Sequence, residues 1–337
     1  MANTIIRIGT RESPLAVWQA QQVQHLLSAQ KIPSELVYIK SEGDTDLVTP
    51  LYALGVQGIF TKALDAALLN NRIDIAVHSM KDVPVQMAEG IIQAAVLKRG
   101  SYKDVFVYKN KADLEKLGYI NGQWTMDSGQ LTVGNHSPLT THHSPFTTHP
   151  LTIATSSVRR IAQWLNRYPN TRIENLRGNV NTRLHKVETH NWNGAIFAAA
   201  GIERINVRPE TSVDLDWMLP APAQGAIVVV CRKNDEAIFN SCRHFNDETT
   251  ALSVKIERDF LKTLTGGCST PISALAMISG EMVVFEGNVL STDGKQKAEI
   301  NQTLPVNGAA DLGIMAGKEI LHNGADKIIE QIRNAQK

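Results

Sequence analysis

The stretch T-I-I-R-I-G-T-R-E-S-P-L (Thr4 to Leu15) decides the fold class of this chain. Its first six residues are rich in β-branched side chains, which predicts a short buried strand over Thr4 to Gly9. A loop follows, in which Ser13 suits the cap of a helix and Pro14 suits its first position, where a missing N–H costs nothing. A strand, a loop and a helix in immediate succession form the repeating unit of an α/β sheet.

The same unit recurs along the chain. Further strands are expected over residues 35–40, 73–77, 151–154, 173–176, 196–201 and 226–230, and helices over 59–70 and 158–168. The junction I-A-T-S-S-V (Ile153 to Val158) repeats I-G-T-R-E-S (Ile8 to Ser13) weakly, as two domains of similar design would. The run 226–230 is too apolar for an edge strand.

A third unit begins at Thr249. Leu252, Ile256 and Phe260 recur every four residues, which predicts a helix with one apolar face. A strand near 281–285 and a helix near 314–321 follow, so we expect a small α+β unit. The stretch 41–57 has no clear period and is expected to be a mobile loop.

Composition excludes several classes of protein. The 337 residues hold 34 Lys+Arg against 33 Asp+Glu, a net charge of +1, which argues against a nucleic-acid partner. No apolar run approaches the ~18 residues needed to span a membrane. Three cysteines, Cys231, Cys242 and Cys268, are too few and too odd in number for a disulfide framework. With no export signal at the N-terminus, we predict a cytoplasmic protein with no membrane partner.

The segment from Asn121 to Ala154 has a composition of its own. Asp127 is its only charged residue, and it contains four histidines: His136, His142, His143 and His149. Such a segment buries too little apolar surface to offset the entropy of ordering it, so we expect a solvated insertion. A transition-metal site is the alternative, but no cysteine or carboxylate cluster completes one, and we predict no metal.

Basic residues gather in one stretch. Residues 155–183 contain six arginines and one acid, Glu174, a local net charge of +5. Arg159 and Arg160 fall in the first turn of an expected helix, where a cation is unfavourable unless an anion binds there. Arg177 and Arg11 lie at similar strand–helix junctions. The alternative, a charged face with ion pairs, is disfavoured because acids are nearly absent locally. Without a phosphate-loop motif, several carboxylates are the expected ligand.

Two further residues stand out. Cys268 follows Gly266 and Gly267, and this hinge would leave the thiol accessible for covalent attachment, although a bystander cysteine fits the spacing as well. Asp82 follows a buried strand, at the end of the sheet where ligands commonly bind. It could stabilise a developing cation or move a proton. It could equally cap a turn before Pro84.

Taken together, these runs resemble the porphobilinogen deaminase family, also called hydroxymethylbilane synthases. The matching runs are I-G-T-R-E-S-P-L-A (Ile8 to Ala16), D-I-A-V-H-S-M-K-D-V-P (Asp74 to Pro84), A-T-S-S-V-R-R (Ala154 to Arg160), L-R-G-N-V-N-T-R-L (Leu176 to Leu184), A-A-G-I-E-R (Ala199 to Arg204), P-A-Q-G-A (Pro222 to Ala226) and G-G-C (Gly266 to Cys268). They occur in family order and cover nearly the whole chain apart from Asn121 to Pro150.

The resemblance implies an α/β enzyme of three domains. Residues 1–98 with 227–245, and residues 102–221, would form two domains similar to periplasmic anion-binding proteins, flanking a cleft, and residues 248–337 a small α+β domain. Cys268 would hold a dipyrromethane cofactor through a thioether. Four porphobilinogen molecules would be added head to tail, each losing ammonia, before water releases hydroxymethylbilane for haem biosynthesis. We expect a monomer.

The resemblance also implies the site residues. Asp82 matches the catalytic carboxylate, which would stabilise the cationic azafulvene left by ammonia. The positions matching cofactor- or substrate-binding residues are Arg11, Ser13, Ser79, Lys81, Thr155, Ser156, Ser157, Arg159, Arg160, Arg177, Gly178, Arg183, Arg204, Gln224, Gly225 and Ala226. Ala53 and Gln57 stand where the family commonly has lysines. A degenerate member, or a non-catalytic polycarboxylate-binding protein, is therefore the alternative.

Overall fold

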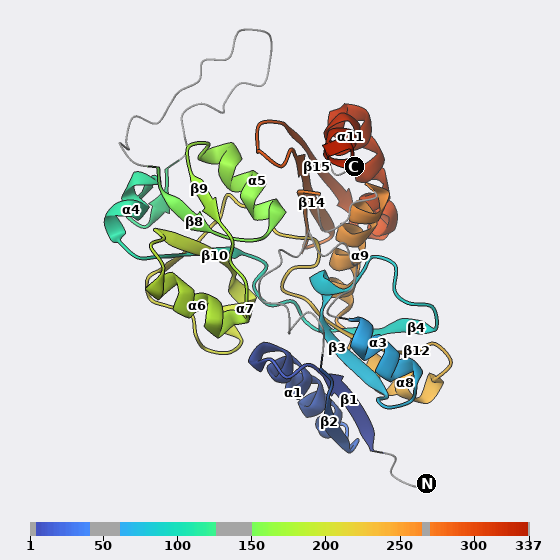
Figure 1. Cartoon of the computed structure of the whole chain (residues 1–337). Helices are drawn as coiled ribbons and strands as arrows, with labels where there is room; N and C mark the ends of the chain where they lie inside the picture. Colours follow the sequence, from blue (N-terminus) through green and yellow to red (C-terminus); the bar gives the residue numbers. More distant parts are fainter. Residues whose placement is uncertain (1–4, 41–60, 126–149, 265–269, 336–337) are drawn as a thin grey trace.

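The computed structural model describes residues 5–40, 61–125, 150–264 and 270–335 (Figure 1). In these residues the strands form two five-stranded sheets, one three-stranded sheet and a two-stranded hairpin. The α/β fold class with a smaller α+β unit at the C-terminal end is therefore confirmed. The expected domain boundaries and the cleft stay predictions.

The first sheet has the strand order β2-β1-β3-β12-β4. Its strands are β1 (Ile6–Thr10), β2 (Ser34–Tyr38), β3 (Ile75–Ser79), β4 (Ile91–Val96) and β12 (Ile227–Arg232). β1 is parallel to β2 and β3, whereas β12 runs antiparallel to both β3 and β4. β12 is thus an interior strand, as its apolar sequence predicts.

The second sheet repeats this design with the order β9-β8-β10-β5-β11. Its strands are β5 (Asp104–Tyr108), β8 (Thr152–Ala154), β9 (Arg172–Glu174), β10 (Gly194–Ala198) and β11 (Ser212–Asp214). β8 is parallel to β9 and β10, and β5 runs antiparallel to β10 and β11. The two sheets therefore share one spatial arrangement of strands and strand directions, as the weak internal repeat predicts, although the antiparallel strand comes last in the chain in the first sheet (β12) and first in the second (β5).

Helices cover both sheets. They are α1 (Pro14–Ala29), α3 (Lys62–Leu69) and α8 (Glu236–Arg243) on the first, and α4 (Lys111–Lys116), α5 (Val158–Arg167), α6 (Val180–Thr189) and α7 (Ala199–Glu203) on the second (Figure 1). α1 begins at Pro14, and the Ser13 hydroxyl accepts the Ala16 N–H at 3.4 Å, so the predicted cap is confirmed. The short hairpin joins β6 (Tyr119–Ile120) to β7 (Gln123–Trp124).

One strand prediction is partly wrong. The strand expected over 196–201 ends at Ala198, and helix α7 begins at Ala199. Alanine has the highest helix propensity, and the Ala199 N–H donates to the Lys103 carbonyl outside the sheet ladder. The run of small apolar residues fits a buried strand and a buried helix equally well, so the sequence could not show where the strand ends.

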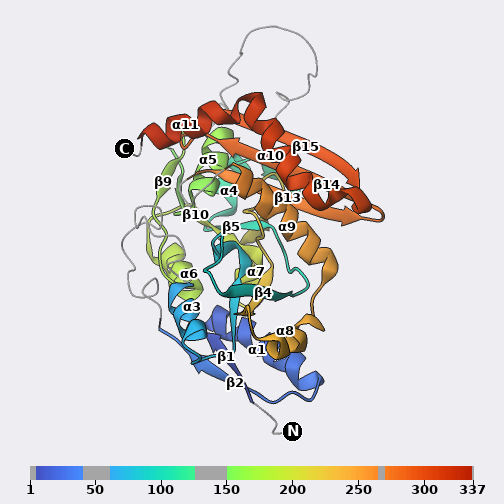
Figure 2. The same cartoon turned by 90° about the vertical axis from the view of Figure 1, so that its right-hand side faces the viewer.

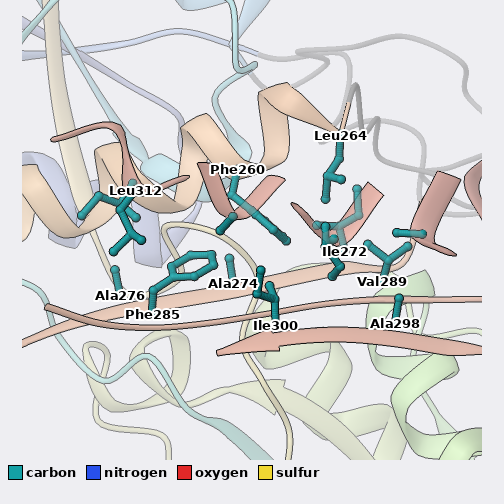
Figure 3. Packing of buried hydrophobic residues seen from close by; sticks show 14 of the residues in the cluster. Phe260, Leu264, Ile272, Ala274, Ala276, Phe285, Val289, Ala298, Ile300 and Leu312 are labelled. Atoms are coloured by element: carbon teal, nitrogen blue, oxygen red, sulfur yellow. The ribbon is translucent and has the colours of Figure 1, made fainter. Parts of the chain in front are cut away.

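The third unit packs three helices on one antiparallel sheet. The sheet contains β13 (Ile272–Ser279), β14 (Met282–Leu290) and β15 (Lys297–Pro305), and the helices are α9 (Glu248–Thr263), α10 (Leu312–Ile320) and α11 (Asp326–Ala335). Two short helices, η2 (Val306–Asp311) and η3 (Leu321–Ala325), connect them. Phe260 and Leu264 point from α9 and its end toward the sheet, where Phe260 meets Phe285 with ring centroids 5.1 Å apart (Figure 3).

This unit lies at the opposite end of the molecule from β1 and β2 (Figures 1 and 2). The third unit contacts the second sheet unit through helix α5. The Gln163 amide donates to the Ser273 hydroxyl at 2.9 Å, and the Asn166 amide donates to the Gly294 carbonyl at 2.7 Å. No helix within the described ranges is long and apolar enough to cross a membrane.

Candidate active site

The predicted site residues follow the carboxyl ends of strands in both sheets. Ser79 ends β3, and the 3-10 turn η1 (Met80–Asp82) follows it directly. In the second sheet unit, Thr155 to Ser157 join β8 to α5, and Arg177 and Gly178 lie between β9 and α6. Ligands of α/β sheets commonly bind at these ends. These three junctions therefore provide the backbone of the candidate site.

The η1 turn presents Lys81 and Asp82 to solvent. The Met80 N–H donates to the Ala226 carbonyl at 3.0 Å, and the Val83 N–H closes the turn on the Met80 carbonyl at 3.2 Å. Both Lys81 and Asp82 are exposed, while Met80 is buried beneath them. The turn is thus anchored by its backbone and by one apolar side chain, and both charged groups remain available to a ligand.

A buried carboxylate, Asp104, organises the two arginines at the start of α5. The Arg159 guanidinium lies 2.8 Å from Asp104 Oδ2, and that of Arg160 lies 2.8 Å from Oδ1. Arg159 also donates to the Leu219 carbonyl and Arg160 to the Ile196 carbonyl. The expectation that these arginines lack an acidic partner is wrong. The partner comes from β5, 55 and 56 positions earlier in the chain, so local composition could not reveal it.

Two cations share this one carboxylate, so the cluster keeps an excess positive charge. The pKa of Asp104 is lowered to about 2: burial opposes its ionisation, but the two guanidinium groups outweigh it. Arg159 Nε is buried and has no hydrogen-bond partner among the described residues. An anionic ligand oxygen would satisfy such a group, which makes the arrangement suitable for a carboxylate.

Gln224 connects the first sheet's turn to this cluster. Its side-chain amide donates to Asp104 Oδ1 at 3.0 Å and to the Tyr102 carbonyl at 2.7 Å, and its oxygen accepts from Lys81 Nζ at 3.4 Å. The pKa of Lys81 is lowered to about 8, mainly because surrounding protein desolvates the ammonium, although it reaches solvent; the nearby Asp82 carboxylate opposes this shift. These contacts fix the Gln224 side chain between the η1 turn and Asp104, and its role in binding stays a prediction.

Arg177 and Arg183, which lie on either side of Gly178 in the chain, place further positive charge at the β9–α6 junction. Arg177 is buried, and Arg183 Nε donates to the Gly178 carbonyl at 2.7 Å. The pKa of Arg183 is lowered to about 10, first by burial and then by the charges of Arg160 and Arg177, while the charge of Asp82 opposes this shift. Asp82 of the first sheet unit is thus close enough to Arg183 of the second for its charge to influence that guanidinium.

Arg204 and Gly225 lie at a close crossing of the two chain segments that connect the sheets. The Arg204 guanidinium donates to the Gly225 carbonyl at 2.6 Å, and it lies over the Trp18 ring at 5.6 Å. Gly225 has φ +86°, and a Cβ there would lie 2.6 Å from the Ser101 carbonyl oxygen. Ala226 is buried and uses its carbonyl to hold the η1 turn.

The predicted hydroxyl residues mostly serve the local backbone. The Ser156 hydroxyl accepts the Leu176 N–H and donates to the Leu176 carbonyl, both at 2.8 Å, which ties the β8 junction to the β9 junction. Thr155 Oγ1 accepts the Ser157 N–H at 3.3 Å, and Ser79 accepts from Gln19 at 2.9 Å. Ser13 caps α1 next to Arg11. These contacts fix loop shape at both junctions.

Several predictions fall outside the described residues: Cys268, the loop positions Ala53 and Gln57, and the four histidines of the insertion. Cys231 and Cys242 are buried free thiols, so Cys231 belongs to the core as expected. Within the part of the chain that the structure describes, no group of three or more His, Cys, Asp or Glu side chains could hold a metal ion.

Sequence reasoning missed a second buried carboxylate, Glu257 on α9. It accepts two bonds from Arg99, at 2.6 and 3.1 Å, and also the Ala223 and Ala276 N–H groups, at 2.6 and 2.8 Å. Arg99 belongs to the segment that leads from the first sheet to the second, and Ala223 to the segment that returns. Glu257 thereby joins both connections to the third unit. No local pattern marks it, because its partners are distant in sequence.

Comparisons with known proteins identify the family of this chain. The family model described as "Porphobilinogen deaminase, dipyromethane cofactor binding domain" matches residues 6–240, and "Porphobilinogen deaminase, C-terminal domain" matches residues 251–322. The chain belongs to the porphobilinogen deaminase family. A chloroplastic porphobilinogen deaminase of Oryza sativa subsp. japonica is 37% identical over 328 residues, which cover 95% of this chain and 83% of the relative. The function is thus porphobilinogen deamination in tetrapyrrole biosynthesis, with a dipyrromethane cofactor.

Solved structures with similar folds include transport-related binding proteins. A nutrient binding protein from Burkholderia cenocepacia bound to methionine has a TM-score of 0.39 and 13% identity, covering 71% of this chain and 92% of that one. A periplasmic substrate-binding protein of an ABC transporter from Coxiella burnetii has a TM-score of 0.39 and 11% identity, covering 75% and 97%.

Proposed function

We propose that Asp82 is the catalytic carboxylate of this porphobilinogen deaminase and that Cys268 attaches its cofactor. The observation that carries the proposal is the position of Asp82 on a backbone-anchored turn beside an excess of buried or half-buried cations. Asp82 is exposed to a ligand, and its charge acts on both Lys81 and Arg183. A carboxylate so placed can meet a cationic reacting group while the surrounding cations hold carboxylates.

The donor set fits a cofactor and a substrate that carry acetate and propionate groups. The side chains that would hold these groups are Lys81, Arg159, Arg160, Arg177 and Arg183, with Arg11 and Arg204 at the adjoining junctions. Guanidinium groups bind carboxylates in pairs and stay charged at every working pH. When bound, the dipyrromethane supplies the primer to which pyrrole units are added.

Asp82 would act on the porphobilinogen being consumed. Departure of ammonia leaves a positive charge on the substrate, and the Asp82 carboxylate stabilises that charge where it develops. The same carboxylate can accept a proton at a pyrrole nitrogen and return it. Lys81, one residue earlier, places a positive charge on the same turn, which suits one of the substrate's two carboxylates.

The finer organisation is also proposed. We propose one domain over residues 1–98 with 227–245, a second over 102–221 and a third over 248–337. In the described residues the chain passes between the two sheets twice, after β4 and after β11, which supports the first two domains. Two buried free thiols, Cys231 and Cys242, suit a reducing compartment such as the cytoplasm.

We propose that the protein is a monomer that acts alone on porphobilinogen. Light scattering of the purified protein would test this oligomeric state.

Intact mass and ammonia release test the chemical assignments together. The wild-type protein should carry a covalent adduct of two pyrrole units, and Cys268→Ser should lack it. Asp82→Asn should keep the adduct and the fold but release ammonia at least ~100-fold more slowly. Asp216→Asn is the matched control, because Asp216 is an exposed carboxylate that is paired with Lys103 and is not among the predicted site residues. An unmodified wild-type mass would contradict the Cys268 assignment, and wild-type rates in Asp82→Asn would contradict the role of Asp82.

A further inference from the structure

Arg258 on α9 binds the backbone of the turn that carries Asp82. Its guanidinium donates to the Val83 carbonyl at 3.0 Å and to the Pro84 carbonyl at 2.6 Å. Longer contacts reach the Met80 carbonyl at 3.4 Å and the Val85 carbonyl at 3.3 Å. One side chain of the third unit therefore gathers four carbonyls from a six-residue stretch of the first sheet unit.

These carbonyls lie on both sides of Asp82 in the chain. The Met80 carbonyl precedes Asp82 and those of Val83 and Pro84 follow it, so the guanidinium bridges the turn from one end to the other. A guanidinium offers five N–H donors in a planar arrangement that a lysine cannot reproduce. Arg258 therefore holds the backbone on both sides of Asp82.

The helix that carries Arg258 is itself held firmly. Glu257, the preceding residue, is fully buried and accepts from Arg99 and from two backbone N–H groups. Phe260, two residues later, packs into the core of the third unit (Figure 3). α9 therefore offers a fixed point of attachment. At its start, the turn is also anchored by the Met80 N–H, which donates to the Ala226 carbonyl.

We propose that Arg258 is a positioning residue for the deaminase reaction: it fixes the η1 turn so that the Asp82 carboxylate is held where the substrate's positive charge develops. The inference rests on the proposed role of Asp82. A misplacement of about 1 Å can reduce a rate ~100-fold. Loss of Arg258 should therefore lower kcat while the cations that bind carboxylates, and hence KM, stay nearly unchanged.

The test compares Arg258→Gln, Arg258→Lys and a matched control, Arg232→Gln. Arg232 also binds two backbone carbonyls of the first sheet unit, those of Leu68 and Ile73 at 3.1 and 2.7 Å, but not the η1 turn. We expect kcat to fall about 10- to 100-fold in Arg258→Gln with KM within about threefold of wild type. Arg258→Lys should be intermediate, and Arg232→Gln should keep wild-type kcat per folded, cofactor-loaded molecule, as measured by intact mass.

Two further readouts separate positioning from general stability. Hydrogen exchange at the Val83 amide, which closes the turn, should accelerate at least about tenfold in Arg258→Gln and stay unchanged in Arg232→Gln. In an Asp82→Asn background, adding Arg258→Gln should slow the reaction less than about threefold, because the group that Arg258 positions is already lost.

The outcomes distinguish the two assignments. If Asp82→Asn is as fast as wild type, the proposed role of Asp82 fails. If Asp82→Asn is slow but Arg258→Gln retains wild-type kcat, or slows Asp82→Asn by its full factor, the positioning role of Arg258 is overturned and that of Asp82 stands. The positioning role of Arg258 would also be overturned if Arg258→Gln raised only KM, or if its Val83 amide exchanged as slowly as in the Arg232→Gln control.

Discussion

Replacing Asp104 by asparagine should be the most destabilising conservative change at this site. The side chain is fully buried, and the two guanidinium groups 2.8 Å from its oxygens belong to side chains that are only 6% and 8% exposed. Asparagine keeps the size of the carboxylate but removes its charge. Arg159 and Arg160 then remain buried side by side without a counter-charge, and Gln224 loses a charged acceptor.

Breaking a buried ion pair from one side typically costs about 3–5 kcal/mol, because an uncompensated charge stays in the interior. We expect the free energy of unfolding of Asp104→Asn to fall by that amount. Asp216→Asn, which removes an exposed partner of Lys103 at 2.6 Å, should lose at most about 1 kcal/mol. Urea unfolding followed by far-UV circular dichroism and by the fluorescence of buried Trp164, which lies on the same helix as the two arginines, measures both variants.

The pH dependence gives the prediction a second arm. The pKa of Asp104 is lowered from 3.8 to about 2, so its contribution to stability is complete above about pH 4 and is lost as the pH falls toward 2. The stability gap between wild type and Asp104→Asn should therefore be constant from pH 7 to pH 5 and narrow below pH 4. A gap under about 1 kcal/mol at pH 7, or one that does not narrow in acid, would refute the reasoning.

Two further predictions concern Lys81 and Gly225. Because its pKa is lowered to about 8, Lys81 is charged below pH 8 and neutral above it. The kcat/KM of the wild type should therefore fall as the pH rises through about 8, whereas that of Lys81→Arg should not. Identical pH profiles of the two proteins would contradict this prediction. Gly225→Ala should lose more than about 2 kcal/mol of stability, because it combines φ +86° with a Cβ 2.6 Å from a carbonyl oxygen. Gly280→Ala, where φ is +59° and the space around the Cβ is open, should lose only about 1 kcal/mol. Equal losses of the two variants in thermal unfolding would show that the contact at Gly225 is relieved.

The fold could be predicted from the sequence wherever a short local pattern determines it. The Ser13–Pro14 pair marks the start of α1 at its observed position, and the apolar run at 226–230 identifies β12 as an interior strand. The repeated junctions at residues 8–13 and 153–158 anticipate the common arrangement of strands in the two sheets. In each case the decisive interactions lie within a few residues or follow from burial alone.

The site could be predicted only in part, because its most important partners are distant in sequence. Arg159 and Arg160 are conspicuous as a pair, but Asp104, which neutralises one charge of the two, is an ordinary acid at the start of β5. Glu257 and Arg258 sit in a helix whose apolar spacing explains its core face and says nothing of their contacts. A carboxylate buried against arginines 55 positions away leaves no local signature.

The same long-range pairing explains how a desolvated cluster of cations can exist before any ligand binds. Buried like charges repel, and burial alone disfavours the charged form of each. One carboxylate shared by Arg159 and Arg160 holds both guanidinium groups in fixed positions and still leaves one positive charge for an incoming anion. A ligand carboxylate then meets donors that are already oriented, so little side-chain entropy is lost on binding. Asp104 therefore serves the binding of anions although it is itself an anion, and removing it should weaken the site as well as the fold.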